Sequence, residues 1–253
     1  MPHPTPAFDP ATGNWLPPPD AKPAWDPEAR KRDKWSGFWN AVLALDLLAL
    51  AVMFGTELLA VLTSSGPAPV SGISAEGIAV SSVLNVFLMG VVPFLWVVAT
   101  RAGGLHGAVH YLKLERFPQS LPWGVLLGFG IVGILVVIAY LLAGTDVPTE
   151  NPVLEQIGSV MTLPLAILVA ATAAWGEEIL FRGVLQRWLG VWGQAAAFGI
   201  AHASYGTILQ VVFPFLLGLL FGFLVKRGVR LWVPILAHFT FDLVMLLSLV
   251  YGW

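Results

Sequence analysis

The sequence predicts an all-α membrane protein: a bundle of about seven transmembrane helices with one further amphipathic helix at the membrane interface. Three observations predict this fold class. The 253-residue chain is 57% hydrophobic and only 11% charged, whereas soluble domains carry about 25% charged residues. Its apolar residues fall in runs of roughly 20, the length with which a helix crosses the hydrocarbon. Its lysines and arginines are confined to alternate ends of these runs, as the positive-inside rule requires.

Composition divides the chain into two regions. Residues 1–34 hold nine prolines, no apolar periodicity and a basic cluster at 30–34, so we expect a disordered cytoplasmic tail that ends in a headgroup anchor. Recruitment of a partner through the prolines is the alternative. Residues 35–253 are expected to form one transmembrane domain. The predicted spans are 36–63, 77–100, 121–143, 159–187, 191–205, 208–225 and 231–251.

Charge placement gives the expected orientation. The thirteen Lys and Arg residues lie in the N-terminal tail, around the second and fourth helix ends and in the sixth connection. The first and third connections carry only acidic charge, and the fifth carries none. We therefore expect a cytoplasmic N-terminus, an outside C-terminus and an odd number of spans, in a bacterial inner (plasma) membrane.

The connection at 101–119 alternates apolar residues with histidine, lysine and arginine. This pattern is typical of an amphipathic helix in the cytoplasmic interface. His106 and His110 are four residues apart and could bind a metal, although a polar interfacial face is the simpler interpretation.

Composition also excludes several classes of function. The chain has no cysteine, which excludes disulfides, thiolate metal ligands and a cysteine nucleophile. Its net charge is -2 with no broad basic patch, so nucleic acid is not an expected partner.

Three apolar segments carry ionisable groups, which are costly in a membrane and usually mark a functional site. In straight helices, Glu177 would lie roughly 15 Å from the basic end of its span, His202 roughly 16 Å, His238 roughly 12 Å and Asp242 roughly 18 Å. We therefore predict that the three segments meet in one layer, at a depth that favours access from the cytoplasmic half.

The two adjacent carboxylates are expected to differ in role. Glu178 precedes Arg182 by four residues, the spacing and order that favour an ion pair on a helix. Glu177 has Phe181 at the same spacing and so lacks a local cation. Glu177 is therefore the better candidate for a general base.

These residue types fit the hydrolysis of an amide. A carboxylate with two imidazoles can deprotonate a water and direct it at a carbonyl, while a polar partner such as Asp242 orients the group or stabilises the oxyanion. The set Glu177, His202 and His238 could instead hold Zn²⁺, whose ligands are commonly His and carboxylate. The residues alone leave both possibilities open.

The ordered motifs resemble the CPBP family of intramembrane proteases, which includes type II CAAX prenyl endopeptidases and bacteriocin-processing or self-immunity proteins. Residues 177–182 match its Glu-Glu-x-x-x-Arg motif, 198–202 match Phe-x-x-x-His, and 238–242 match His-x-x-x-Asn or Asp. The resemblance covers roughly residues 120–251.

The resemblance implies that Glu177 activates the water and that His202 assists it. It further implies that His238 and Asp242 bind the oxyanion or complete the site. Eukaryotic prenyl endopeptidases have Asn at the last position; Asp242 departs from them, which makes a metal-ligand role more plausible there. The family has been described both as glutamic and as metallo-peptidases, and we favour the glutamic type without a cofactor. The supporting residues would be Glu178, Arg182 and Phe198.

The expected function is therefore an intramembrane endopeptidase that cuts a membrane-associated or C-terminal tail substrate, of CAAX or sorting-signal type. Its partners would be a peptide or membrane-protein substrate and the lipid bilayer. A proton-coupled transporter is the alternative, although no internal repeat supports it. A catalytically inactive membrane scaffold is another.

The first span carries two further carboxylates. Asp46 and Glu57 are eleven residues apart and so share a helical face. They could line a water-filled path or bind a proton. For Glu57 we favour a position near the outer interface; Asp46 could pair with another helix.

Overall fold

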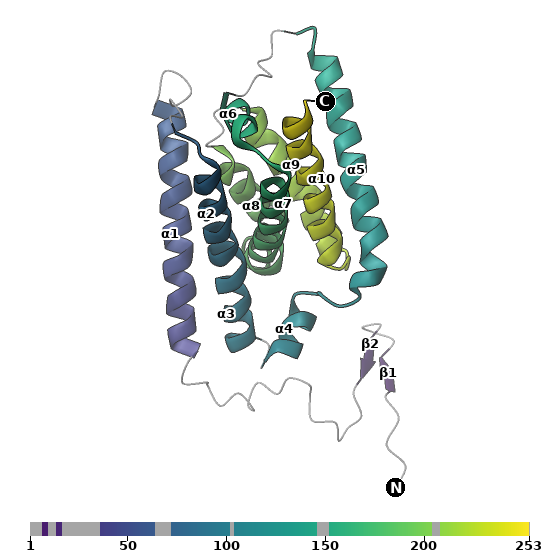
Figure 1. Cartoon of the computed structure of the whole chain (residues 1–253). Helices are drawn as coiled ribbons and strands as arrows, with labels where there is room; N and C mark the ends of the chain where they lie inside the picture. Colours follow the sequence, from purple (N-terminus) through teal and green to yellow (C-terminus); the bar gives the residue numbers. More distant parts are fainter. Residues whose placement is uncertain are drawn as a thin grey trace.

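Figure 1 shows the computed structural model, which describes residues 7–9, 14–16, 36–63, 72–101, 104–145, 152–203 and 208–252. Within these residues the membrane part of the chain is entirely helical, so the all-α fold class is confirmed. The elements are β1 (Ala7–Asp9), β2 (Asn14–Leu16), α1 (Ser36–Thr63), α2 (Ala75–Asn85), η1 (Val86–Val91), α3 (Val92–Thr100), α4 (Leu105–Tyr111), α5 (Phe117–Leu142), α6 (Pro152–Val160), α7 (Leu163–Glu177), η2 (Glu178–Leu185), α8 (Gln186–Ala201), α9 (Leu209–Lys226) and α10 (Trp232–Tyr251).

The described residues form six helical stretches that are long and apolar enough to cross a membrane. One of them, 163–201, is 39 residues long, about twice the length that a crossing needs. It covers both the fourth and the fifth predicted spans. The sequence pattern predicts two separate spans here, whereas helical hydrogen bonding continues from one to the other in the structure. The protein is an integral membrane protein on this basis.

Gly190 explains how one long stretch serves as two. Its backbone has φ 68° and ψ -176°, a conformation that essentially only glycine adopts. The chain turns back here, because His202 returns to within 4.0 Å of Glu177 although 25 residues separate them. The predicted break between 187 and 191 is therefore present. Beyond it, the rest of α8 is a short helix that runs back toward Glu177.

The outward faces of the long helices are apolar. Leu45, Leu48 and Leu62 of α1 and Val136 and Tyr140 of α5 are each at least 60% exposed. Large exposed apolar surfaces of this extent are rare on soluble monomers. They fit a surface that lies in lipid, where no hydrophobic penalty attaches to exposure.

The inner faces pack closely through small residues. Gly124 and Gly128 of α5 lie against α10: a Cβ atom on Gly128 would be 2.6 Å from the Cβ of Thr240 and 2.7 Å from the carbonyl oxygen of Ala237. Gly218 of α9 meets Ala195 of α8 in the same manner. Small residues four apart let helix backbones approach within a membrane.

The two ends of the bundle differ in charge. Figure 1 shows the start of α1, α4 and the start of α5 at one end, and α6 with the C-terminus at the other. The first is the basic end and the second the acidic end, as the sequence pattern predicts. The orientation of these ends relative to the cell stays a prediction.

Helix α4 is shorter and more buried than the predicted interfacial helix. Its Ala108 is fully buried and the following Leu112 is 2% exposed. The segment that follows α4 is bonded to the residues before α10. The backbone N–H of Leu231 donates to the carbonyl of Lys113, and Arg230 Nη1 donates to Glu115 Oε2 at 2.8 Å. Burial opposes ionisation of Glu115, but a backbone hydrogen bond together with Arg230 and His110 outweighs it and lowers the pKa of this carboxyl.

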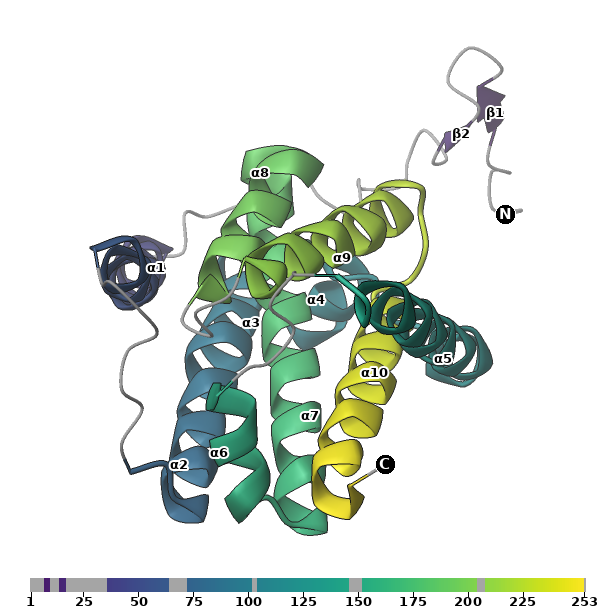
Figure 2. The same cartoon turned by 90° about the horizontal axis from the view of Figure 1, so that it is seen from above.

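Two elements were not predicted. Helix α6 precedes α7 and lies beside α2, as Figure 2 shows from above. It also contacts the end of α10, where Gly158 lies against Leu249. In the N-terminal region β1 and β2 form a short antiparallel pair that aligns Ala7 with Leu16. Most of the predicted tail, 1–34, lies outside the described residues, so the division into tail and membrane domain stays a prediction.

Candidate active site

The site forms where α7 passes into η2. Glu177 is the last residue of α7 and Glu178 the first of η2, a π-helical segment of eight residues. A π-helix inserts an extra residue per turn and occurs most often at functional sites. The end of α7 is also closely packed, since Gly176 lies against the backbone of Val86 and the side chain of Met89 in η1.

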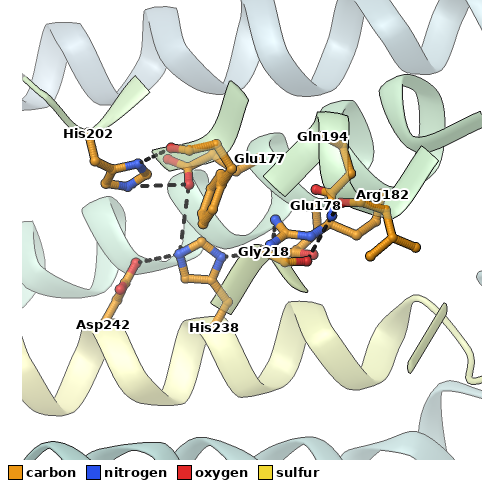
Figure 3. A network of polar contacts seen from close by, with 10 residues as sticks. Glu177, Glu178, Arg182, Gln194, His202, Gly218, His238 and Asp242 are labelled. Carbon is orange, nitrogen blue, oxygen red and sulfur yellow. Dashed lines mark hydrogen bonds and ion pairs between the residues drawn. The ribbon is translucent and has the colours of Figure 1, made fainter. Parts of the chain in front are cut away.

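Glu178 and Arg182 form the ion pair predicted from their spacing. Arg182 Nη1 donates to Glu178 Oε1 at 2.8 Å, and neither side chain is exposed. His238 Nδ1 reaches the same carboxylate oxygen at 3.0 Å. Glu178 therefore links η2 to α10, and it holds the His238 ring in one orientation (Figure 3).

Phe198 packs against three polar side chains of the site. The guanidinium of Arg182 lies 4.3 Å from the centre of its ring, a cation–π geometry. The rings of His202 and His238 lie 4.7 Å and 6.1 Å away. The aromatic residue of the Phe-x-x-x-His motif thus serves as the apolar wall against which the polar groups are set.

The His202 ring is fixed by its own helix. Its Nδ1 lies 2.8 Å from the carbonyl oxygen of Phe198, which has no hydrogen to give, so Nδ1 must be the donor. In the neutral ring Nε2 then carries the lone pair. This Nε2 faces Glu177 Oε2 at 4.0 Å.

Glu177 lies between the two histidines (Figure 3). Its Oε2 is 4.0 Å from His202 Nε2 and 3.8 Å from His238 Nε2, and it has no hydrogen-bond partner among the described residues. Both distances exceed a direct hydrogen bond and suit a bridging water. Glu177 thus has a free acceptor between two imidazoles.

Asp242 completes the group. Its Oδ2 lies 3.2 Å from His238 Nε2, one helical turn further along α10. Carboxylates therefore face both ring nitrogens of His238, with Glu178 on one side and Asp242 on the other. The predicted meeting of the three segments is confirmed as geometry; the chemical role of each residue stays a prediction.

Sequence reasoning missed two buried members of the site. Gln194 is fully buried and its Nε2 donates to the carbonyl of Gly218 at 2.7 Å, which joins α8 to α9 (Figure 3). Phe221 of α9 forms a second cation–π contact with Arg182, at 5.3 Å. A lone polar residue in an apolar run was the available signal for Gln194, whereas nothing distinguishes Phe221 from its apolar neighbours.

A cavity of about 420 Å³ reaches Glu177 and His202. It lies among the acidic-end halves of α1, α2, α7 and α10 and is also bounded by α6. The predicted depth of the site favoured access from the basic, cytoplasmic half. The cavity instead opens a path to the site through the acidic half. Straight-helix depths place the site near mid-membrane but say nothing of which half is hollow. Its polar lining residues are Glu57, Ser81, Ser82, Asn85, Glu177 and His202.

The first-span carboxylates differ from each other. Glu57 is half-buried and lines this cavity, whereas its predicted position near the outer interface stays a prediction. Asp46 is 7% exposed, and neither of its carboxylate oxygens has a hydrogen-bond partner in the described part of the chain. The possible pairing of Asp46 with another helix is therefore not seen.

The donor types of the site are those that Zn²⁺ uses, so the metal alternative can be compared with the geometry. In the described ranges, no group of three or more His, Asp or Glu side chains is arranged so that it could hold a metal ion. His106 and His110 do not belong to such a group either. Their rings lie edge to face, with ring centres 4.9 Å apart.

Comparison with known proteins bears on the same segment. Residues 159–244 match the family model of the Type II CAAX prenyl endopeptidase Rce1-like proteins. The expected family resemblance is confirmed over these residues. They contain every residue of the three motifs, from Glu177 to Asp242.

A curated relative is also found. The chain is 35% identical over 95 residues to the uncharacterized protein YpbD of Bacillus subtilis (strain 168), which is 36% of this chain and 48% of that protein. The chain thus matches about half the length of this relative. No solved structure matches the chain.

Proposed function

We propose that the protein is an intramembrane endopeptidase in which Glu177 activates the water that attacks a peptide bond. The observation that carries the proposal is the free Oε2 of Glu177 between His202 and His238, at the end of a cavity. The match of the surrounding segment to a family of prenyl endopeptidases supports the same chemistry.

The residues have distinct tasks in this proposal. A water between Glu177 and His202 gives one proton to Glu177 Oε2 and a hydrogen bond to His202 Nε2. Its oxygen attacks the carbonyl carbon, and the Nε2–H of His238, which faces Asp242 Oδ2 at 3.2 Å before the reaction, shares its hydrogen with the oxyanion that forms. Glu177 then passes its proton to the leaving amine, which yields an acid and an amine from one peptide bond and one water.

The remaining residues keep this arrangement in place. Asp242 and Glu178 orient His238 from opposite sides. Arg182 balances the charge of Glu178 where both are shielded from solvent. Preorganised groups of this kind lower the barrier because they need not reorient during the reaction.

We favour the glutamic, metal-independent form. The support is that both ring nitrogens of His238 already face carboxylates, Glu178 at Nδ1 and Asp242 at Nε2. A Zn²⁺ held by Glu177, His202 and His238 is the competing form, in which the ion would polarise the carbonyl and activate the water.

The substrate would be a membrane-associated segment or C-terminal tail. The cavity lies in the acidic half of the bundle, which the positive-inside rule assigns to the outside of the cell. The scissile bond would then be reached from the outer leaflet side, which fits removal of a sorting-signal-like anchor better than a cytoplasmic tail.

The test uses the purified full-length protein and a library of C-terminal tail peptides, prenylated and unmodified, with cleavage read by mass spectrometry. We expect the wild type to cut and Glu177→Gln to lose at least about 10³-fold in rate, with unchanged thermal unfolding in detergent. Equal cleavage by both proteins would exclude Glu177 as the base. A parallel arm adds a zinc chelator: unchanged cleavage supports the glutamic form, and loss restored by Zn²⁺ replaces it with the metal form.

A further inference from the structure

A second cavity, of about 190 Å³, lies at the basic end of the bundle. It is bounded by the end of η2 with the start of α8, by the end of α9 and by the residues that follow α4. Among the described residues it shares none with the cavity that reaches Glu177. This basic-end pocket is smaller than the roughly 300–1,000 Å³ of pockets for drug-sized ligands, so it suits a small chemical group.

The charged side chains of the basic-end pocket are all cationic. Lys113, Arg182, Arg187 and Lys226 line it, and no Asp or Glu is among its described lining residues. Of these four cations, Arg182 alone forms an ion pair with a carboxylate in the described part of the chain, which is Glu178 at 2.8 Å. Three positive charges therefore surround a small hollow without a described counter-charge, and such an arrangement attracts anions.

Arg182 supplies buried hydrogen-bond donors to this pocket. Its side chain bonds Glu178 through Nη1 and is 2% exposed, yet neither Nε nor Nη2 has a hydrogen-bond partner among the described residues. The rings of Phe198 and Phe221 contact the guanidinium but offer it no oxygen acceptor. Buried polar groups in proteins are nearly always hydrogen-bonded. Two unpaired donors at the wall of a cationic pocket thus indicate a binding site for an acceptor.

Two of the other cations are held in place by the backbone. Lys113 Nζ donates to the carbonyl of Val225 at 3.2 Å, which uses one of its three hydrogens. Arg187 donates from Nε to the carbonyl of Gly183 and from Nη2 to that of Tyr111, and its guanidinium lies over the Tyr111 ring. Both side chains are therefore fixed beside the pocket and keep further N–H donors for a ligand.

We propose that the basic-end pocket binds a phosphate group, carried by an anionic lipid headgroup or present as free phosphate. Guanidinium groups bind phosphate oxygens through paired N–H bonds, and lysine binds them as a point charge. Gln186 adds Oε1, a buried acceptor without a partner in the described ranges, which suits a hydroxyl on the same ligand. Basic pockets between transmembrane helices are known sites for anionic headgroups.

The bound phosphate would lie on the opposite edge of the guanidinium from Glu178. Nη1 of Arg182 stays with that carboxylate, whereas Nε and Nη2 gain an acceptor. Because Glu178 also bonds His238, the pocket is connected to the polar network of the site through one side chain. The site itself does not depend on the proposed peptidase activity, and its occupancy is measured without turnover.

The experiment titrates the purified full-length protein in a neutral detergent at constant ionic strength. The ligands are inorganic phosphate, short-chain phosphatidylglycerol, and phosphatidylcholine with the same acyl chains. Binding is read by calorimetry and by the rise in unfolding temperature that a ligand of the folded state causes. We expect saturable binding of phosphatidylglycerol, at least about ten-fold tighter than that of phosphatidylcholine. Weaker binding of inorganic phosphate assigns the site to a lipid headgroup, and equal or tighter binding assigns it to free phosphate.

Single substitutions locate the bound anion. Lys113→Gln and Lys226→Gln should each weaken binding by about five-fold, with unfolding temperatures near that of the wild type when no ligand is present. Arg227→Gln is the matched control, since Arg227 is an exposed cation next to Lys226 that does not line the pocket. It should leave the affinity unchanged. The absence of saturable binding by either anion, or equal losses in Lys226→Gln and Arg227→Gln, overturns the proposal.

Discussion

At the scale of single residues, the site depends on a fully shielded ion pair. Glu178 and Arg182 have no exposed side-chain surface, and the guanidinium is also held over the rings of Phe198 and Phe221. Removing two charges from water is costly, and their attraction offsets the cost only when the geometry is good. The pair is therefore better understood as a positioning device for His238 than as a source of stability.

This interpretation predicts an asymmetric response to substitution. Arg182→Met should destabilise the protein by roughly 3–5 kcal/mol, because Glu178 would remain buried without its cation. Arg182→Met with Glu178→Gln should recover a large part of that loss, since the stranded charge is gone. Thermal and chemical unfolding in detergent measure both variants.

The double variant also separates stability from activity. It should lose most of its activity although it folds, because His238 Nδ1 then faces a neutral amide oxygen in place of the Glu178 carboxylate. If the double variant is as unstable as Arg182→Met alone, the cost does not come from an unpaired carboxylate.

Residue spacing predicted some of these contacts and not others. The Glu178–Arg182 pair follows from positions four apart on one helix. The bond from His238 to the same carboxylate does not, because it depends on how η2 and α10 are rotated toward each other. The free position of Glu177 was predicted from its lack of a local cation, and the orphan Oε2 agrees with that.

At the scale of elements, close helix packing sets the position of the site. Helix α10 carries His238 and Asp242, and it is held against α5 through Gly124 and Gly128. A larger side chain at Gly128 has no room, because the obstacles include the backbone oxygen of Ala237. Helix α10 would have to move away, and the histidine would move with it.

Gly128→Leu should therefore lower the free energy of unfolding by about 2 kcal/mol or more and reduce peptide cleavage. Gly130→Leu is the control, since a Cβ atom at Gly130 meets nothing within 4 Å. The control should unfold and cleave like the wild type. Equal effects of the two substitutions would show that the helix, rather than the α5–α10 contact, is sensitive to leucine.

Sequence patterns predicted the long elements well and the short or bent ones poorly. Apolar runs located α1, α5 and α10 within a few residues, because length and hydropathy determine a crossing. The turn at Gly190 falls in the predicted break between 187 and 191, although the helical hydrogen bonding continues across it in the structure. Helix α6 is amphipathic and brief, so it carries no crossing signal. The π-segments η1 and η2 leave no mark in hydropathy at all.

At the scale of the whole molecule, charge and cavity are arranged along one axis. Basic residues gather at the end where α1 starts and α4 lies (Figure 1). The residues that line the cavity leading to Glu177 belong to the other half. The ionisable groups lie between the two. Orientation in the membrane therefore decides from which side a substrate reaches the site, which the depth of the residues alone could not do.

This arrangement predicts which side of the membrane the cavity faces. The chain has no cysteine, so single cysteines report position without background. Glu76→Cys, at the start of α2, and Ser81→Cys, in the cavity lining, should react with a membrane-impermeant maleimide applied to intact cells. Lys226→Cys, at the basic end of α9, should react only after the membrane is opened.

The three positions together distinguish orientation from access. Labelling of Lys226→Cys in intact cells, with Glu76→Cys protected, would invert the topology and place the cavity on the cytoplasmic side. Labelling of Glu76→Cys without Ser81→Cys would keep the orientation but close the cavity to water, so that substrate could arrive only through lipid. Labelling of both, with loss of Ser81→Cys labelling when a peptide that the wild type cleaves is bound to the protein that also carries Glu177→Gln, would connect the outer face, the cavity and the substrate in one path to Glu177.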